Sequence, residues 1–360
     1  MSQSRLKSEV RVVGTGLLGS SIGLGLTAKG VTVQLDDISP SSLRLAIDYG
    51  AGVAATPNDD PALIVVCVPP DVTARVVAEQ LRMFPNAIVT DVASVKAAPL
   101  QELHELGADV SRYLGTHPMA GRERSGALAG RGDLFIGRPW VIAGHDDITY
   151  SQGGLVEDLI LDLGAMPIEM NAADHDRAVA VASHVPQLVS SLMAARLETA
   201  DDEALRLAGQ GLRDVTRIAA SDTNLWVQIL GANSVSVAEE LTKVRSDLDA
   251  LITALTDIDR AGARRVVADA LHAGNAGVER LPGKHGQKVR FARISVRVDD
   301  KPGQLARLMT TIDEIGINIE DFRIEHAEGA AFGVAEVLVQ PERATDLVNA
   351  LSEREWTVLL

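Results

Sequence analysis

One histidine of this 360-residue chain stands where catalytic side chains are often found. His117 follows a predicted short strand at residues 113–115, precedes a proline and opens a stretch rich in glycine and arginine up to residue 132. A loop of this length in a compact domain is usually functional or disordered. From this position His117 is a candidate catalytic residue. The alternative is a surface histidine in a turn.

The spacing of three glycines near the N-terminus gives a second chemical signal. Gly14, Gly16 and Gly19 follow a β-branched run and precede an apolar segment with helical period. In such a strand–turn–helix the glycines permit the turn, the approach of a pyrophosphate and close packing of helix on strand. The helix N-terminus adds unpaired N–H groups. We predict a dinucleotide site that includes Leu17 and Leu18; the alternative is a glycine turn without a ligand.

An acidic residue sets the predicted choice of dinucleotide. The next predicted strand, residues 31–35, ends at Asp36, about 20 residues past the glycines, where an acid accepts the ribose 2′-hydroxyl of NAD. Asp36 and Asp37 would repel a 2′-phosphate, so NAD is favoured over NADP. A further predicted strand at residues 63–68 ends at Val68 and Pro69, and doubly wound sheets bind ligands at such strand ends.

Other polar residues lie at strand ends or on predicted helices. Ser94 follows the predicted strand at residues 87–90, where it either faces the cofactor or caps a helix. His184 and Gln187 are three residues apart and therefore share a helix face. The Asp-His-Asp sequence at residues 174–176 could suggest a metal. Because no further ligand cluster accompanies it and acids also cap helix N-termini, we predict no metal site.

The elements that position these residues fall into three predicted domains. Alternating strand and helix periods over residues 1–170 predict an α/β domain with a Rossmann-type, doubly wound sheet. Residues 171–283 have sparse glycine and predict an all-α domain, followed by a linker at residues 274–288 that overlaps its end. Residues 290–360 have the βαββαβ order of the ferredoxin-like split βαβ. Its predicted strands are residues 294–298, 317–324, 332–339 and 356–358.

Composition narrows the class of protein. Hydrophobic residues make up 46% of the chain and aromatic residues only 3%, so the cores must be built from Leu, Val, Ile and Ala. A net charge of −15 argues against nucleic acid and anionic membranes as partners, although solubility also explains it. A single cysteine, Cys67, excludes a disulfide framework. Since no signal region is present and no apolar run approaches the ~20 residues of a membrane span, we expect a cytoplasmic protein.

With these motifs in hand, the chain resembles the prephenate/arogenate dehydrogenases of tyrosine biosynthesis that carry a C-terminal ACT domain. The resemblance covers essentially the whole chain. The motifs that carry it are GTGLLG at 14–19, DVASVK at 91–96, HPMAG at 117–121 with Glu123, FIGRPW at 135–140, DHDR at 174–177, SHVP at 183–186, DVTRI at 214–218 and Trp226.

The resemblance implies roles for the catalytic residues. His117 matches the histidine that bonds the substrate 4-hydroxyl and helps to remove its proton. Ser94 matches a serine near the same hydroxyl and the nicotinamide. Arg217 matches the arginine that grips a substrate carboxylate, for which a guanidinium offers a bidentate fork.

Four further residues of the substrate site follow from the same resemblance. Glu123 matches a gating acid in the loop after the histidine, and His184 and Asp214 match residues that line the site. Gln187 stands where many prephenate-specific members carry a second histidine. The resemblance therefore implies NAD-dependent oxidative decarboxylation of prephenate to 4-hydroxyphenylpyruvate, with arogenate dehydrogenation to tyrosine as the alternative.

Two other functions stay open at this point. A β-hydroxyacid dehydrogenase joins the same nucleotide fold to a helical domain, but tends to use a lysine of that domain as its base. An amino-acid sensor could hold NAD only as a ligand. The presence of His117, Ser94 and Arg217 argues against both.

The resemblance also implies an assembly and an effector. Family members dimerise through the helical domain, so we expect a homodimer. An ACT domain would hold an aromatic amino acid, tyrosine above all, near Pro302, Gly303 and Asn318. The alternative is a structural dimerisation module without ligand.

Overall fold

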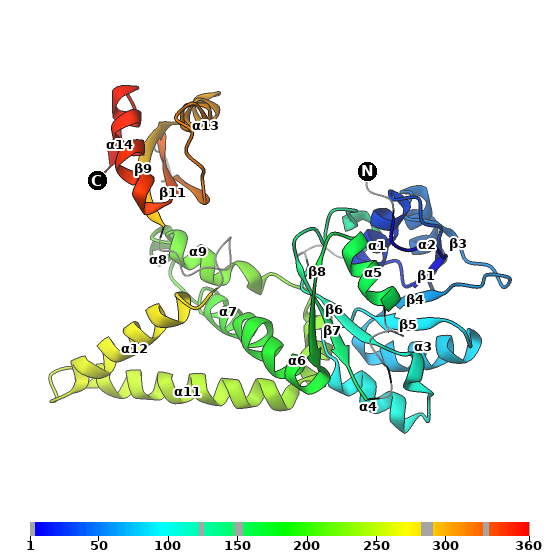
Figure 1. Cartoon of the computed structure of the whole chain (residues 1–360). Coiled ribbons are helices and arrows are strands. Elements are labelled where there is room, and N and C mark those ends of the chain that lie inside the picture. Colours follow the sequence, from blue (N-terminus) through cyan, green and yellow to red (C-terminus); the bar gives the residue numbers. More distant parts are fainter. Residues whose placement is uncertain are drawn as a thin grey trace. The chain divides into compact units, whose positions relative to one another are not determined.

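The computed structural model describes residues 4–121, 126–146, 148, 154–281, 291–326 and 331–359. The chain forms two compact units, Met1–Arg245 and Ser246–Leu360 (Figure 1). Glu123, the predicted gating acid, lies outside the described residues.

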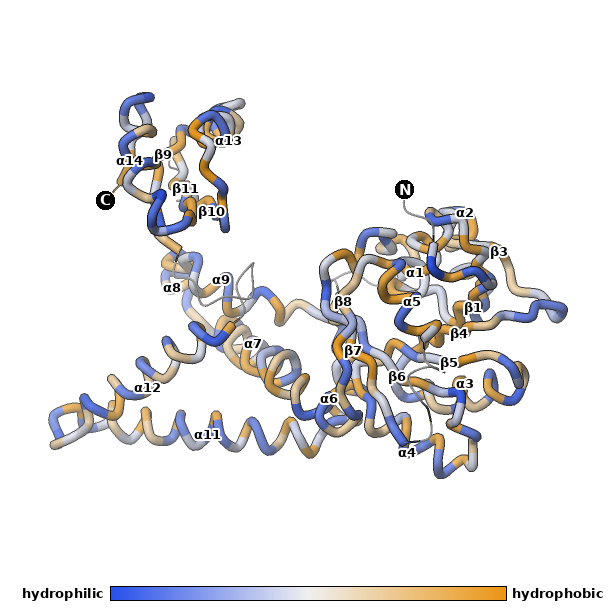
Figure 2. Tube along the Cα trace, in the orientation of Figure 1, coloured by the Kyte–Doolittle hydropathy of each residue, from blue (hydrophilic) through white to orange (hydrophobic). Residues whose placement is uncertain are grey.

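The first unit is built on a five-stranded parallel sheet with the order β3-β2-β1-β4-β5. Helices cover both of its faces, so the central strands β1 and β4 are buried throughout, and β4 is coloured hydrophobic in Figure 2. The predicted doubly wound sheet is thus present. Its elements are β1 (Val10–Val13), α1 (Leu17–Thr27), β2 (Val33–Asp36), α2 (Pro40–Asp48), β3 (Val53–Ala54), β4 (Leu63–Val66), α3 (Pro70–Met83), β5 (Ile88–Asp91) and α4 (Ala97–Glu105).

A second, three-stranded sheet continues this unit in the order β6-β7-β8. Its strands are β6 (Gly115–Pro118), β7 (Pro139–Gly144) and β8 (Met166–Asn171), with α5 (Gly154–Asp162) before β8 and short 3₁₀ turns at Val110–Arg112 and Ala127–Ala129. The strand predicted at residues 113–115 begins later than expected, because Tyr113 makes only an isolated bridge to Val89. His117 therefore lies within a strand and not beyond its end.

The predicted helical region is confirmed. Its elements are α6 (Ala172–Val179), a π-helical turn (Ala180–His184), α7 (Val185–Ala195), α8 (Asp202–Arg206), α9 (Gln210–Thr216), a 3₁₀ turn (Arg217–Ala219), α10 (Thr223–Ala232), α11 (Ser234–Thr256) and α12 (Ala263–Val278). The linker predicted from residue 274 was wrong at its start, since α12 continues to Val278. The alanine and valine residues around Gly274 and Gly277 outweigh the helix cost of about 1 kcal/mol for each glycine.

One continuous helical run, Ala172–Ala195, is long and apolar enough to cross a membrane by length and composition alone. The sequence analysis had expected no such run. It contains buried polar residues, His175, Asp176 and His184, that make hydrogen bonds within the first unit. These contacts identify the run as a helix of the folded domain.

The described C-terminal segment has the predicted order of strands and helices. Its sheet has the order β10-β11-β9-β12, with every neighbouring pair antiparallel. The second strand starts four residues later than predicted because Ile317 packs into the core and residues 317–320 approach the sheet as a loop. The elements are β9 (Ala292–Asp299), α13 (Gln304–Glu314), β10 (Asp321–His326), β11 (Phe332–Val339), a 3₁₀ turn (Pro341–Arg343), α14 (Ala344–Glu353) and β12 (Val358–Leu359).

Candidate active site

The glycine turn between β1 and α1 has the shape needed for a phosphate group. Gly14 has φ of 97°, and a Cβ there would lie 2.4 Å from the carbonyl oxygen of Cys67. A Cβ at Gly19 would lie 1.9 Å from the Gly14 oxygen, so both positions exclude side chains. A Cβ at Gly16 would meet nothing within 4 Å, and no side chain caps the N-terminus of α1. The N–H groups of the first turn thus border open space, as dinucleotide binding requires.

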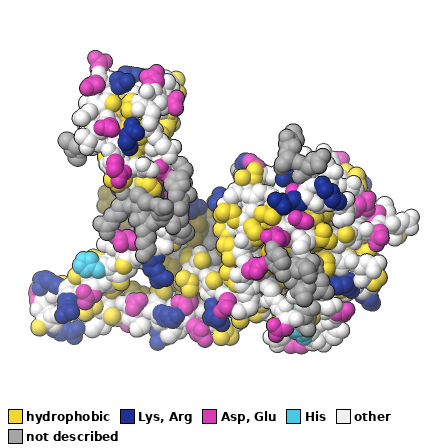
Figure 3. All heavy atoms as spheres, in the orientation of Figure 1, with side chains coloured by type: hydrophobic (Ala, Val, Ile, Leu, Met, Phe, Trp, Pro, Cys, Tyr) yellow, Lys and Arg dark blue, Asp and Glu magenta, His cyan; other side chains and the backbone are white. Residues whose placement is uncertain are grey.

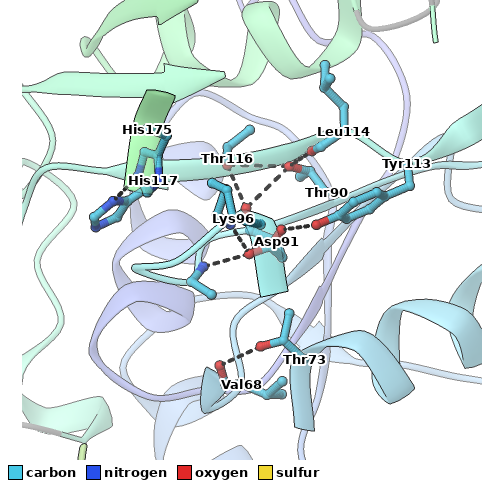
Figure 4. Close-up of polar contacts among 12 residues, drawn as sticks. Val68, Thr73, Thr90, Asp91, Lys96, Tyr113, Leu114, Thr116, His117 and His175 are labelled. Atoms are coloured by element: carbon cyan, nitrogen blue, oxygen red, sulfur yellow. Dashed lines mark hydrogen bonds and ion pairs between the residues drawn. The ribbon is translucent and has the colours of Figure 1, made fainter. Parts of the chain in front are cut away.

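The other predicted cofactor residues surround this turn. Leu17 and Leu18 begin α1 and are half-buried. Val68 packs beside Gly14, and Pro69 stands at the N-terminus of α3. In the close-up of Figure 4, the carbonyl oxygen of Val68 accepts a hydrogen bond from Thr73.

The acid at the end of β2 has a basic neighbour. Asp36 forms an ion pair of 2.6 Å with Arg11 of β1; their side chains are 42% and 8% exposed. The Arg11 guanidinium also lies over the ring of Phe84, 5.1 Å from its centroid. Asp37, in contrast, accepts hydrogen bonds of 2.7 Å from both the N–H and the hydroxyl of Thr15. Asp37 therefore holds the glycine turn, while Asp36 is the carboxylate at the surface.

His117 is buried in β6 and meets a second histidine (Figure 4). Its Nδ1 lies 2.9 Å from Nε2 of His175 in α6, with the two rings edge to face. Nδ1 of His175 lies 2.7 Å from Oδ1 of Asp176. We call His117, His175 and Asp176 the histidine relay.

Burial and nearby cations keep the pKa of His117 well below its ordinary value. Burial is the main cause, and positive charge on His175, Lys96 or His184 acts in the same direction. The imidazole is therefore neutral at pH 7 and able to accept a proton. Within the described residues, its Nε2 has no hydrogen-bond partner.

Asp176 joins the relay to the nucleotide-binding sheet. Its Oδ1 and Oδ2 accept hydrogen bonds from the backbone N–H groups of Lys96 and Ala97, at 2.8 and 2.9 Å. Asp176 thus caps α4. The sequence analysis had assigned the acids of residues 174–176 to the start of their own helix, but Asn171 caps α6.

The cap supplied by Asp176 also changes the interpretation of Ser94. We had weighed Ser94 as a helix cap, yet no side chain of the N-cap residue Lys96 or of Ser94 caps α4. Ser94 is half-buried between β5 and α4, and its hydroxyl makes no hydrogen bond within the described part of the chain. A hydroxyl in this position can bond to a ligand.

Asp91 and Lys96, on either side of Ser94 in the chain, form a buried ion pair that was not predicted from the sequence. Lys96 Nζ donates to Asp91 Oδ1, and both side chains are almost fully buried. The hydroxyl of Tyr113 donates to Oδ2 of the same carboxylate at 2.7 Å. Burial lowers the pKa of Lys96 and raises that of Tyr113 well above its ordinary value. In the sequence, this ion pair was indicated only by the spacing of its two residues, since Asp91 ends β5 and Lys96 follows just before α4.

The π-helical turn places His184 in the same region. His184 is 1% exposed, its Nδ1 lies 3.2 Å from the amide nitrogen of Asn233, and its ring meets the edge of Trp226. The same amide nitrogen donates to the Asp176 carbonyl at 2.7 Å. Burial lowers the pKa of His184 to about 4. Because Nδ1 accepts from the amide, Nε2 carries a proton and is a buried donor without a partner, as a ligand site requires.

The remaining predicted substrate residues lie on neighbouring helices. Gln187 of α7 is buried and donates from Nε2 to Ser221 Oγ at 2.7 Å. Arg217 begins the 3₁₀ turn that packs against α7, and its side chain is exposed. Asp214 is exposed on α9 and accepts from Gln210 at 2.9 Å. Among the residues that the structure describes, no group of three or more His, Cys, Asp or Glu side chains could hold a metal ion.

Comparison with known proteins decides the family. Residues 22–168 match the nucleotide-binding domain of prephenate dehydrogenase, and residues 171–268 match its dimerization domain. The protein named "Probable prephenate dehydrogenase NovF" from Streptomyces niveus is 35% identical over 353 residues, which cover 96% of this chain and 98% of the relative. The chain belongs to the prephenate dehydrogenase family.

Solved structures share the architecture. Synechocystis arogenate dehydrogenase has 25% identity and a TM-score of 0.62, covering 75% of this chain and 99% of its own. Prephenate dehydrogenase from Aquifex aeolicus, solved with hydroxyphenyl propionate and NAD⁺, has 23% identity and a TM-score of 0.66, covering 77% and 99%. The predicted family, enzyme class and order of a Rossmann-like domain before a helical dimerization domain are confirmed.

Members of the prephenate dehydrogenase family are oxidoreductases, and the residues predicted for catalysis in this chain gather in its first unit. His117 and His184 are joined there by the hydrogen-bonded network around Asp176, and Ser94 lies two residues before Lys96, whose backbone N–H donates to that carboxylate. Sequence reasoning did not find His175, Asp176 or Asn233 as parts of the site. The signal for His175 and Asp176 was their position inside the DHDR motif at 174–177.

Proposed function

We propose that this oxidoreductase uses NAD to convert prephenate to 4-hydroxyphenylpyruvate and carbon dioxide. The observation that carries the proposal is the buried, neutral His117, whose Nε2 has no hydrogen-bond partner within the described residues. The nicotinamide, when bound, accepts the hydride from C4 of the substrate. His117 takes the proton of the 4-hydroxyl, since its low pKa keeps it in the basic form.

Other residues orient the substrate in this proposal. The Ser94 hydroxyl bonds the reacting oxygen beside His117. The Nε2–H of His184, a buried donor, bonds an oxygen of the substrate, and Arg217 grips a carboxylate with its guanidinium. Asp214 lines the site in this proposal, and the resemblance implies Glu123, which lies outside the described residues, as the gating acid.

The choice between prephenate and arogenate rests on Gln187. Its amide offers both a donor and an acceptor, so it can meet either a keto oxygen or an ammonium group. The 35% identity to a relative named for prephenate supports prephenate as the substrate. Arogenate is the alternative, supported by the likeness to an arogenate dehydrogenase of Synechocystis.

Steady-state kinetics with both substrates and both dinucleotides tests the proposal. We expect NADH formation with prephenate and a higher kcat/KM for NAD⁺ than for NADP⁺. An arogenate kcat/KM more than tenfold above that for prephenate would reverse the substrate assignment. Absence of turnover with either substrate would contradict the enzymatic role.

We further propose that residues 290–360 form an ACT domain that binds tyrosine. The βαββαβ order and the antiparallel sheet support this. Gly303 has φ of 86° at the N-terminus of α13, and no side chain caps that helix, so its N–H groups can meet a carboxylate next to Pro302. Asn318, whose amide donates to Glu320 at 2.8 Å, would hold the amino group.

Isothermal titration of the full-length protein with tyrosine tests this second proposal. Heat of binding, together with inhibition that is lost when residues 287–360 are removed, would support an effector site. Feedback of this kind requires a coupling free energy of ~1–3 kcal/mol. No heat at millimolar tyrosine, with inhibition only by competition at the active site, would favour the structural role.

We also propose that the protein acts as a cytoplasmic homodimer. The match to a dimerization domain supports this, and apolar side chains are exposed along α11 at Val235, Val244, Leu248, Ile252 and Leu255. Figure 2 shows hydrophobic and hydrophilic residues interspersed along α11 and α12, and Figure 3 shows charged side chains on this part of the molecule. Sedimentation velocity would show a species of twice the chain mass.

A further inference from the structure

The histidine relay is a line of two hydrogen bonds within the first unit. It runs from Asp176 through His175 to His117, with heavy-atom distances of 2.7 and 2.9 Å. The three residues are 4%, 0% and 8% exposed. Figure 4 shows the His117 and His175 rings pointing toward each other from β6 and α6. Because the three side chains are buried and bonded to one another, the protonation of one ring nitrogen determines that of the next.

The direction of the bonds follows from Asp176. Its carboxyl oxygens lie against three N–H donors: two backbone groups at the start of α4 and the Nδ1 of His175. The carboxyl is thus an acceptor, so Nδ1 of His175 carries the proton. In a neutral imidazole the other nitrogen is then an acceptor. Nε2 of His175 accepts from His117, whose Nδ1 carries the proton and whose Nε2 has the lone pair.

We propose that His175 and Asp176 are positioning residues that fix the tautomer of His117, so that its Nε2 is the nitrogen that takes the substrate proton. The inference rests on the proposed function only in naming that proton as the one on the reacting hydroxyl. In the reaction, the O–H bond of the substrate hydroxyl breaks as the Nε2–H bond forms. The carbon that bears this hydroxyl gives up its hydride, which the nicotinamide accepts when bound. His117 becomes an imidazolium whose Nδ1–H stays bonded to His175.

The positioning role of the pair has to be distinguished from a purely structural role. Asp176 has a structural role as the cap of α4, and its removal would disturb folding as well as the relay. Among the described residues, the ring nitrogens of His175 bond only to Asp176 and His117, and they do not contact the N–H groups at the start of α4. His175 is therefore the position at which positioning and folding can be separated.

The first experiment reads the tautomer directly in the full-length protein without ligands. Nitrogen-15 NMR of histidine-labelled wild type should show His117 protonated at Nδ1 and not at Nε2, with its signals identified by their loss in His117→Asn. In His175→Phe, which keeps a ring but no nitrogen, the Nε2–H form of His117 should increase, since the hydrogen bond that selects the tautomer is gone. A wild-type His117 protonated at Nε2 would overturn the proposal.

The second experiment measures kcat and KM. His175→Phe should lower kcat by about 10²-fold, near the lower end of a general base's contribution, with little change in KM. His175→Gln should recover part of the loss, because its carbonyl oxygen can accept from Nδ1 of His117. His104→Gln, at an exposed position of α4, is the control for a histidine replaced outside the relay.

The two readouts separate this inference from the proposed function. A kcat of His175→Phe equal to that of wild type would overturn the proposal even if the tautomer is as described. If neither prephenate nor arogenate is turned over by wild type, the proposed function fails, while the NMR spectrum still decides the direction of the hydrogen bonds. A thermal unfolding curve of each variant shows that it is folded.

Discussion

Replacing Asp36 should change the dinucleotide preference by more than the loss of one hydrogen bond, because Arg11 stands beside it. In the wild type the guanidinium is occupied by an ion pair of 2.6 Å. If Asp36 binds the ribose as we propose, Asp36→Ala removes the acceptor for the ribose hydroxyl of NAD and releases Arg11 at the place where NADP would carry its 2′-phosphate. An arginine near this position is the usual way to accommodate that phosphate.

The expected size follows from the two interactions. A hydrogen bond to a charged group contributes about 1.5–3 kcal/mol. One such bond is lost for NAD and one is gained for NADP, so the preference should move by about 3–6 kcal/mol, or about 10²–10⁴-fold in the ratio of dissociation constants. The variant should also unfold at a lower temperature without ligand, since the Arg11 side chain is only 8% exposed and loses its partner.

Titration calorimetry with NAD⁺ and NADP⁺ measures both constants without relying on turnover. Asp36→Ala should bind NAD⁺ more weakly and NADP⁺ more tightly than wild type. In the double variant with Arg11→Met the gain for NADP⁺ should disappear, while the loss for NAD⁺ remains. The reasoning is refuted if wild type prefers NADP⁺, or if the double variant keeps the gain.

Four further outcomes are expected from the same geometry. His117→Asn should lower kcat by about 10²–10⁴-fold with a smaller change in KM; near-normal turnover would exclude its role as base. Arg217→Ala should mainly raise KM, because a carboxylate contact is present in ground and transition states alike, and a loss confined to kcat would contradict this. The value of kcat/KM should remain high below pH 6.5, since the pKa of His117 is well below that value. A fall in kcat/KM on acidification with a midpoint above pH 6.5 would count against a buried neutral base. The free energy of unfolding should fall as pH drops from about 6.5 toward 4, because His184, with a pKa of about 4, stays neutral in the fold while the unfolded chain gains the proton. The loss is up to about 3 kcal/mol. Denaturant titrations of His184→Gln should show a flatter dependence of this free energy on pH.

The parts of the site that sequence predicted are those with local causes. The glycine turn, the acid after β2 and the buried strand β4 each depend on residues close in the chain, so spacing and period were enough. The helical region was predicted from its composition. The boundary error at β6 arose because Tyr113 and Leu114 look like a strand, although the ladder to β7 begins only at Gly115.

The parts that sequence did not predict depend on contacts between distant segments. Asp176 caps a helix 79 residues earlier in the chain, and no local pattern indicates which helix an acid caps. The pairing of His117 with His175 spans 58 residues. The sequence could identify Asp-His-Asp as polar and helical. Only the fold brings its middle residue, His175, to His117 in β6.

The π-helical turn at Ala180–His184 makes this site sensitive to the length of the chain. His175 and His184 are nine residues apart, and at about 100° per residue a regular α-helix would place them on opposite faces. The wider turn reduces that rotation, and one amide, that of Asn233, reaches both the Asp176 carbonyl and the His184 ring. Deleting a single residue between 180 and 183 would restore a regular helix in which the two histidines are eight residues apart, about 80° around the axis, so both would stay on one side. The same deletion between 177 and 179 would leave the π turn in place and rotate one histidine by about 100° relative to the other, although no side chain of the site had been replaced. In a set of one-residue deletions along this helical run, those between 177 and 179 should thus abolish turnover, while those within the turn should preserve both helicity and more of the activity.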